Sequence, residues 1–308
     1  MSDFGVELNQ STSDYMAEED AKLTKPPSSF MPELQNEPLA EVSYRFVFPG
    51  KGDFQCAYTG LVFVMAQKAE MCYRTVMWNE SLLQPAGKVA AGPLFKIVCP
   101  EDAVCQLHLQ HCEIKDAAFT ETLLSVANMT DEGMAILKPL KITDTHAIVE
   151  VPQPSAFGIV RNFEVLWRLF RTPKPVRGQV LLFLQPANPV TQRQNLNLVL
   201  LSSNVPLEEV RIRHAISRYI SAPINCRLIE EQNYTVHCPT AYKIQPKKAA
   251  FDLEFGPNYH PTFEVRLETS QEQVTITLRD QTDTDVWEQD IDLTDFRKSS
   301  ASGQKLSK

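Results

Sequence analysis

The stretch Thr172-Pro-Lys-Pro-Val-Arg-Gly-Gln-Val-Leu-Leu-Phe-Leu184 decides how this chain is divided. Two prolines and a glycine interrupt the apolar-rich segment before them. An unbroken apolar run at residues 180–184 follows at once. The chain has 308 residues, a length at which about two domains are expected. We therefore place a boundary between two units of ordinary domain size at residues 175 and 176.

Short apolar runs bounded by proline and glycine lie on both sides of this boundary. Many such runs in succession are typical of β-strands and indicate sandwich architecture. We predict an all-β fold, with two consecutive antiparallel β-sandwich subdomains over residues 41–175 and 176–297. The predicted strands lie at 44–48, 54–65, 71–78, 94–99, 104–112, 146–151, 180–184, 196–201, 234–238, 251–255, 263–267, 274–278 and 286–293.

Two segments fit a helical period. Residues 206–220 have apolar side chains at helical spacing, two acids in the first turn, and Asn204 upstream as a candidate cap. Residues 163–170 fit either a helix or a strand. One or two short helices are therefore expected beside the strands.

The two ends differ in composition from the rest. Residues 1–40 carry eight acids against Lys22 and Lys25, have no apolar period, and predict a disordered acidic leader. Residues 298–308 are rich in Ser, Gly and Lys and predict a disordered tail. The net charge is −8, of which the leader supplies −6, so −2 remains elsewhere. That balance lacks the basic surface that nucleic acid requires, and no nucleic-acid partner is expected.

The sequence also bears on the cellular compartment. No apolar run approaches the roughly 20 residues that span a bilayer, and the first residues do not resemble a signal peptide. The chain has 7 cysteines, an odd number that favours reduced thiols over a disulfide framework. We expect a cytosolic protein without membrane insertion.

Several motifs resemble one known family. They include Ile148-Val-Glu-Val-Pro-Gln-Pro-Ser-Ala-Phe-Gly158, Phe54-Gln-Cys-Ala-Tyr-Thr-Gly-Leu-Val-Phe63 and Phe251-Asp-Leu-Glu-Phe-Gly-Pro-Asn-Tyr-His260. Together they resemble the function-to-find domain of inflammasome sensors of the NOD-like receptor and caspase-recruitment type, in its fish-like form. The resemblance covers about residues 41–297. The first half is similar to a subdomain of ankyrins and netrin receptors, and the second half to the UPA subdomain.

The resemblance implies a self-cleavage site, in which Ser155 would attack the carbonyl of Pro154. The position of the family's general base holds Asn128, and the position of an assisting glutamate holds Leu137. An amide cannot accept a proton near neutral pH, and leucine supplies neither charge nor hydrogen bond. Pro154 stands where the family carries phenylalanine, and its ring fixes the backbone angle φ beside the bond to be strained. We therefore predict a vestigial site and no enzyme.

One residue offers an alternative to this prediction. His146 lies nine residues before Ser155 and is the one substitute base that we can name. With it, the chain would be a functional autoprotease that cleaves between Pro154 and Ser155. A strand histidine with a hydrogen-bonded ring is the simpler interpretation of His146.

We expect neither a metal nor a cofactor. Cys105, His108, His111 and Cys112 have a spacing that superficially suggests zinc. On a strand, however, Cys105 and His111 would face one way while His108 and Cys112 face the other, so the four cannot converge.

The resemblance implies a non-enzymatic protein-interaction module of innate immune signalling. Its expected partners are inflammasome sensors or further copies of itself, bound through the UPA-like half, with a role as regulator or decoy. Docking on a cytosolic dipeptidyl peptidase is a second expected contact. An ankyrin-like cytoskeletal adaptor is a further alternative, against which the sequence offers neither ankyrin repeats nor a basic patch.

Overall fold

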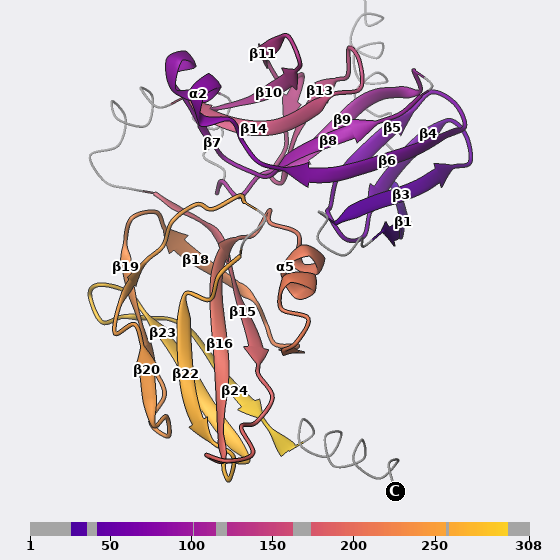
Figure 1. Cartoon of the computed structure of the whole chain (residues 1–308). Coiled ribbons are helices and arrows are strands. Elements are labelled where there is room, and N and C mark those ends of the chain that lie inside the picture. The colour runs from indigo at the N-terminus through magenta and orange to yellow at the C-terminus, as the bar shows by residue number, and fades with distance from the viewer. Residues whose placement is uncertain are drawn as a thin grey trace, which may run out of the picture.

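The computed structural model describes residues 26–35, 42–100, 102–114, 122–162, 174–256 and 259–294. Figure 1 shows two β-rich halves, one drawn from indigo to magenta and the other from orange to yellow. The described elements are almost all strands, so the predicted all-β fold is confirmed. None of the helices in these ranges is long and apolar enough to cross a membrane.

The first half contains two sheets packed face to face. The first sheet has the order β1 (Ser28–Phe30), β4 (Gly52–Cys56), β5 (Val62–Met65), β9 (Val104–Gln110), β13 (His146–Glu150) and β12 (Lys141–Ile142). The second sheet has the order β11 (Gly133–Leu137), β10 (Leu124–Thr130), β14 (Ala156–Asn162), β8 (Leu94–Val98), β6 (Ala69–Val76), β3 (Ser43–Phe48) and β2 (Glu33–Gln35), and β7 (Lys88–Ala90) also pairs with β14.

Alternate residues of these strands fill the space between the two sheets. Phe63 and Leu107 from the first sheet meet Tyr73, Phe95 and Phe157 from the second, and all five side chains are buried in one apolar cluster. The period of two along a strand places every second side chain on this inner face. This burial supplies the main stabilising contribution of the first half.

Part of the predicted leader belongs to this sandwich. We expected residues 1–40 to lack structure, yet residues 28–30 form β1 and residues 33–35 form β2. β1 pairs in parallel with β4, an exception to the expected antiparallel pairing, and β2 pairs antiparallel with β3. The acidic composition of this segment did not predict that Phe30 is buried. The burial of Phe30 offsets the entropy cost of ordering the segment.

The second half is also a pair of sheets. One sheet has the order β17 (Arg218–Ile220), β15 (Pro175–Leu184), β16 (Arg193–Ser202), β22 (Phe263–Glu268) and β20 (Lys243–Gln245), and β18 (Asn225–Ile229) pairs with the other end of β15. The other sheet has the order β21 (Ala249–Ala250), β19 (Asn233–His237), β23 (Gln273–Arg279) and β24 (Asp285–Asp292).

β15 is buried on both of its faces, which explains why its sequence is apolar without alternation. Val180 and Leu182 lie in the core between the two sheets of the second half. Leu181 and Phe183 face the other way, into a cluster that includes Val210 of a helix. A strand covered on both faces needs apolar residues at consecutive positions.

In the part of the chain that the structure describes, the helices are few and short. α2 (Glu80–Leu83) continues into the 3-10 helix η1 (Gln84–Ala86), and α5 (Leu207–Arg213) lies at the junction of the two halves (Figure 1). The prediction of a helix over 206–220 was correct only for its first half. After His214 the chain makes a turn, and residues 218–220 pair with the end of β15 instead.

Other predicted segments also changed. The run 54–65 is a hairpin of β4 and β5, with a turn at Gly60 whose φ is 69°. Residues 251–255 form no strand, although Phe251 and Phe255 are buried. The predicted segment 163–170 lies outside the described residues. The apolar residues at 251–255 therefore predicted burial correctly but predicted a strand wrongly.

Candidate functional site

Ser155 lies just before β14, next to the middle of the second sheet. Its backbone carbonyl accepts a hydrogen bond of 2.8 Å from the amide of Ile97, which holds the residue before β14 against β8. Three residues further on, Gly158 lies under the indole of Trp78, and a Cβ at this position would lie only 2.4 Å from the ring. The close approach of Trp78 explains the glycine of the motif.

Asn128 of β10 lies beside Ser155. β10 pairs with β14 so that Asn128 is opposite Phe157, which brings its side chain to the serine that precedes the strand. Asn128 is only 5% exposed, and its Oδ1 accepts a hydrogen bond from the hydroxyl of Ser155. The structure thus brings together two of the residues that the sequence assigned to the site.

The chemistry available to this pair is limited. For Ser155 to become a nucleophile, a base must take the proton of its hydroxyl. Asn128 provides an acceptor at the correct place, but an amide oxygen does not hold a proton near neutral pH. The arrangement therefore orients the hydroxyl without activating it.

Leu137 and Pro154 add no catalytic group. Leu137 is on β11, opposite Val126 of β10, and its side chain packs against the apolar core. Pro154 is half-buried and directly precedes Ser155.

His146 belongs to the other sheet. It begins β13, where Ala147 and Val149 point into the core, so His146 points to the outer face. Its Nε2 lies 2.9 Å from the carbonyl oxygen of Gly60 and its Nδ1 lies 2.8 Å from the hydroxyl of Thr145. Burial lowers the pKa of His146, although the bond to Gly60 opposes this shift. Both ring nitrogens are occupied away from Ser155.

The residues of the zinc-like spacing are also dispersed. Cys105 is exposed whereas Cys112 is buried, and burial raises the pKa of the Cys112 thiol to about 12. His111 lies 3.1 Å from the carbonyl of Thr143, and burial lowers its pKa to about 4. Among the residues that the structure describes, no group of three or more His, Cys, Asp or Glu side chains could hold a metal ion.

A second cluster of buried polar residues lies where the two halves meet. Glu209 of α5 is 5% exposed, and its carboxylate accepts hydrogen bonds from Tyr44, at 3.1 Å, and from Thr75 of the first half. Burial raises the pKa of Glu209, and the hydrogen bonds from Thr75 and Tyr44 oppose that rise. The contact therefore joins α5 to β3 and β6 through one buried acid.

Two more polar contacts cross the same junction. Arg161 of β14 is buried and pairs with Glu230 of the second half at 2.8 Å and with Glu113 at 3.6 Å. Asn204 donates from Nδ2 to the carbonyl of Ala91 at 2.9 Å. The sequence suggested Asn204 as a helix cap, but Pro206 occupies the cap position and Asn204 connects the two halves instead.

These junction residues could hardly be predicted from local sequence. Glu209 has the ordinary place of an acid in a first helical turn, and only its neighbours in space make it unusual. The partners of Arg161 and Asn204 come from segments far away in the chain. No local pattern could have indicated them.

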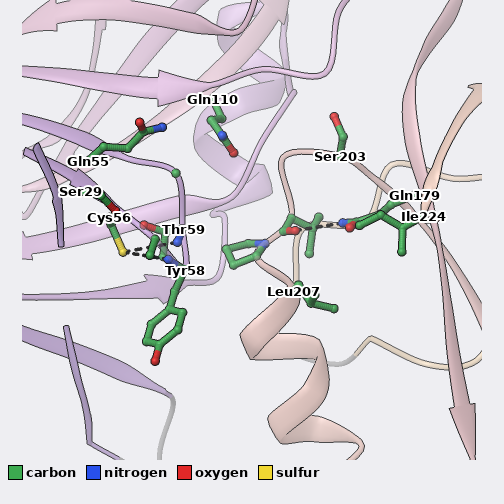
Figure 2. Close-up of a pocket in the computed structure, with 14 residues that line it drawn as sticks. Ser29, Gln55, Cys56, Tyr58, Thr59, Gln110, Gln179, Ser203, Leu207 and Ile224 are labelled. Carbon is green, nitrogen blue, oxygen red and sulfur yellow. Dashed lines mark hydrogen bonds between the residues drawn. The ribbon is translucent and has the colours of Figure 1, made fainter. Parts of the chain in front are cut away.

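A pocket opens at the junction (Figure 2). Its volume is about 320 Å³, and it lies between the β4–β5 hairpin of the first half and the segment that leads into α5. Its lining carries no charged side chain; Ser29, Gln55, Gln110, Gln179 and Ser203 are among its polar residues. Such a lining suits hydrogen-bonding groups without net charge.

Comparison with known proteins agrees with the architecture. The "Function to find" family model matches residues 39–166, and the "UPA-FIIND domain" model matches residues 176–291. Caspase recruitment domain-containing protein 8 of Homo sapiens is 27% identical over 215 residues, which cover 67% of this chain and 39% of that protein. NACHT, LRR and PYD domains-containing protein 1a of Mus musculus is 30% identical over 122 residues, covering 38% of this chain and 10% of that protein.

The chain thus spans well under half the length of these relatives. The two family models lie in the same order as the two halves of the structure, and together they extend over most of its described residues. The chain belongs to the function-to-find family, with a function-to-find domain followed by a UPA-FIIND domain.

Proposed function

We propose that this chain is a non-enzymatic interaction module of inflammasome signalling, in which the self-cleavage site is vestigial. The chain would act in the cytosol, as a regulator or a decoy. A chain that stays whole between Pro154 and Ser155 cannot release residues 155–308 as a separate fragment. It would therefore engage partners of its relatives without passing on a cleavage-dependent signal.

The contact between Ser155 and Asn128 is the observation that carries this proposal. The serine keeps a hydrogen-bond acceptor in the place from which a base would act, but the acceptor is an amide. Leu137 and Pro154 remove two further groups on which the chemistry of the family depends. Three changes around one serine support the loss of cleavage more strongly than any one of them.

The intact mass of the purified chain, expressed with different tags at its two ends, tests the absence of cleavage. We expect one species at the mass of the tagged 308-residue chain, for which the untagged value is 34.8 kDa. A gel alone would be ambiguous, because a cut after Pro154 gives two products of nearly equal length. Two masses that meet between Pro154 and Ser155 would refute the vestigial site, and His146→Ala would then test the substitute base.

The proposed partners are inflammasome sensors, or further copies of the chain, bound through the second half. The two most exposed large apolar side chains that the structure describes in this half are Val190, 88% exposed, and Ile216, 87% exposed. Val190 lies in the turn between β15 and β16, Ile216 lies between α5 and β17, and we propose that both belong to the partner surface. A cytosolic dipeptidyl peptidase is a second proposed partner of the whole module.

Co-precipitation with a sensor that contains a caspase-recruitment region tests the proposed partner surface. Val190→Asp and Ile216→Asp should each reduce the recovered sensor at least several-fold if this surface forms the interface. Met77→Asp, at a site in the first half that is 67% exposed, is the matched control and should leave recovery unchanged. Equal recovery with all three variants would contradict binding through Val190 and Ile216. The same assay with the peptidase tests the second partner.

A further inference from the structure

A second pocket opens in the second half, at the turn that joins β15 to β16. Its volume is about 450 Å³, which lies in the range of small-molecule sites. The described residues that line it are Gln185, Pro186, Asn188, Thr191, Arg193, Asn195 and Arg266. This lining contains two arginines and no acid, so it favours an anionic ligand.

The turn that shapes this pocket is held by its own hydrogen bonds. The Oδ1 atom of Asn188 accepts from the backbone amides of Val190, at 2.9 Å, and of Thr191, at 3.0 Å. The backbone amide of Asn188 donates to the carbonyl of Arg193 at 2.8 Å, which closes the turn. Because the backbone uses the oxygen of the Asn188 side chain, its NH2 group remains as a donor at the pocket.

Arg193 supplies a cation that no acid neutralises directly. Its guanidinium lies over the ring of Tyr242, with Cζ 4.0 Å from the ring centroid. Glu268 is its register partner on β22, yet no carboxylate of the described residues forms an ion pair with Arg193. Stacking on an aromatic ring holds a guanidinium in place and leaves the N–H groups in its plane to a ligand.

Arg266 of β22 supplies the second guanidinium. It is the register partner of Asn195, so the two side chains lie on the same face of the sheet. Glu264 accepts a hydrogen bond of 2.7 Å from Nε of Arg266, which orients the side chain and leaves its terminal nitrogens as donors. Glu264 offsets one of the two positive charges of the arginines, so the pocket still attracts an anion.

We infer that this pocket binds a phosphorylated sugar or polyol, with the phosphate held by Arg193, Arg266 and Asn188. Guanidinium groups match the oxygens of a phosphate in pairs, and a phosphate monoester presents three acceptor oxygens to these three donor groups. The remaining volume suits a polar body, because the amides of Gln185 and Asn195 can bind hydroxyl groups. The described lining has no aromatic residue on which a nucleobase could stack. This inference goes beyond the proposed function and does not rest on it.

A soluble sugar phosphate is favoured over the headgroup of a phosphorylated inositol lipid. Both present the same phosphate, but a lipid also brings the protein onto an anionic bilayer. Recognition at such a surface is typical of clusters of Lys and Arg, whereas this chain has a net charge of −8. Glu264 and Glu268 of β22, the strand that carries Arg266, add to the repulsion.

Isothermal titration calorimetry of the full-length chain tests the site, with glucose 6-phosphate, inorganic phosphate and glucose as probes at low salt. We expect glucose 6-phosphate to bind at least ten-fold more tightly than inorganic phosphate, because the sugar adds contacts with the amides. Glucose alone should show no binding. Vesicles that carry phosphatidylinositol 4-phosphate should not sediment the chain. Sedimentation that glucose 6-phosphate prevents would assign the site to the lipid headgroup instead.

Variants of the pocket give the test its specificity. Arg193→Gln and Arg266→Gln should each weaken the binding of glucose 6-phosphate at least ten-fold, whereas Arg227→Gln, on the exposed side of β18, is the matched control. Asn188→Asp is the sharpest variant: its carboxylate still accepts from the two amides of the turn, but its charge repels phosphate. It should abolish binding, and Asn225→Asp, the same change at an exposed position of β18, should have no effect.

Three outcomes would contradict the inference. If neither glucose 6-phosphate nor inorganic phosphate binds, the site is refuted, since every phosphorylated ligand presents the same group. Binding that the variants of Arg193, Arg266 and Asn188 leave unchanged would place the phosphate elsewhere and refute it equally. Equal affinity for glucose 6-phosphate and inorganic phosphate would refute the recognition of the sugar. None of these measurements involves Ser155 or a sensor partner, so this inference and the proposed function fail independently.

Discussion

Asn128 occupies the place from which a base would act on Ser155, and this single residue can be exchanged. A positioned general base contributes roughly 10²- to 10⁴-fold to such a step. We expect Asn128→His combined with Pro154→Phe to produce a cut before Ser155, which intact mass would detect within hours of purification. Ser155→Ala in the same background should remain whole. If the double variant also stays intact, the geometry around Ser155 has lost more than its base and its aromatic anchor.

The hydroxyl of Ser155 also has a structural role at this scale. It is a hydrogen-bond donor to the buried Asn128, so Ser155→Ala leaves the amide oxygen without this donor. We expect a loss of about 1–3 kcal/mol in the free energy of unfolding, measured by urea denaturation. Ser81→Ala is the control, because the hydroxyl of Ser81 binds the exposed side chain of Asn79. Equal stability of the two variants would show that the bond to Asn128 contributes little.

At the scale of the element, β15 serves two cores at once. Leu182 is 1% exposed and faces the core of the second half, so Leu182→Ala should cost about 2–5 kcal/mol in the free energy of unfolding. Leu181 faces α5 and the junction, and Leu181→Ala should mainly increase hydrogen exchange of α5. Val190→Ala, at the exposed β15–β16 turn, should change stability by less than about 0.5 kcal/mol. Indistinguishable exchange of α5 in the Leu181 and Leu182 variants would contradict the division of β15 between two cores.

The elements that the sequence predicted best are those whose signal is local. Residues 263–267 and 274–278 were predicted to within one residue at each end, as β22 and β23. The run 180–184 also predicted a strand, but only its second half, because β15 already begins at Pro175, inside the segment that its prolines and glycine marked as a break. The prediction of a helix over residues 206–220 was wrong beyond Arg213. Helical spacing continues there, but the pairing of residues 218–220 with β15 determines the backbone conformation. β1 was missed because its single anchor, Phe30, lies in an acidic segment.

The candidate site shows the same limit. The resemblance pointed to Ser155 and Asn128, which lie side by side although they are 27 residues apart in the chain. It could not show that the ring of His146 is held at Gly60, because that contact depends on how the β4–β5 turn packs on β13. Glu209 was read as a helix-end acid because its partners Tyr44 and Thr75 belong to the other half. Contacts between segments that are distant in the chain produce no local sequence pattern, so they could not be predicted from a single sequence.

At the scale of the whole molecule, the junction of the two halves is held by buried ionisable groups. Burial raises the pKa of Glu209 and also that of Glu113, so both carboxyl groups retain their protons to a higher pH in the folded chain than in the unfolded chain. Between the two pKa values the native state binds more protons, and stability therefore falls as the pH rises. The contribution of each group is fully present below its unfolded pKa, about 4.3, and is lost as the pH rises through the folded value.

Glu209→Gln should weaken this dependence at the junction. The amide keeps an oxygen that can accept from Tyr44 and Thr75, but it carries no charge at any pH. We expect the free energy of unfolding of the natural chain to fall from pH 4.5 to pH 7.5 more steeply than that of the variant, in urea titrations at four pH values. Glu208→Gln, in the same helical turn, is the matched control, because Glu208 forms a surface pair with Arg211 and should leave the slope unchanged. If Glu209→Gln and Glu208→Gln give the same slope as the natural chain, the buried acid does not couple the docking of the two halves to pH. A reduced slope in the Glu209 variant alone would show that protonation of this one carboxyl group makes the association of the two sandwiches depend on pH.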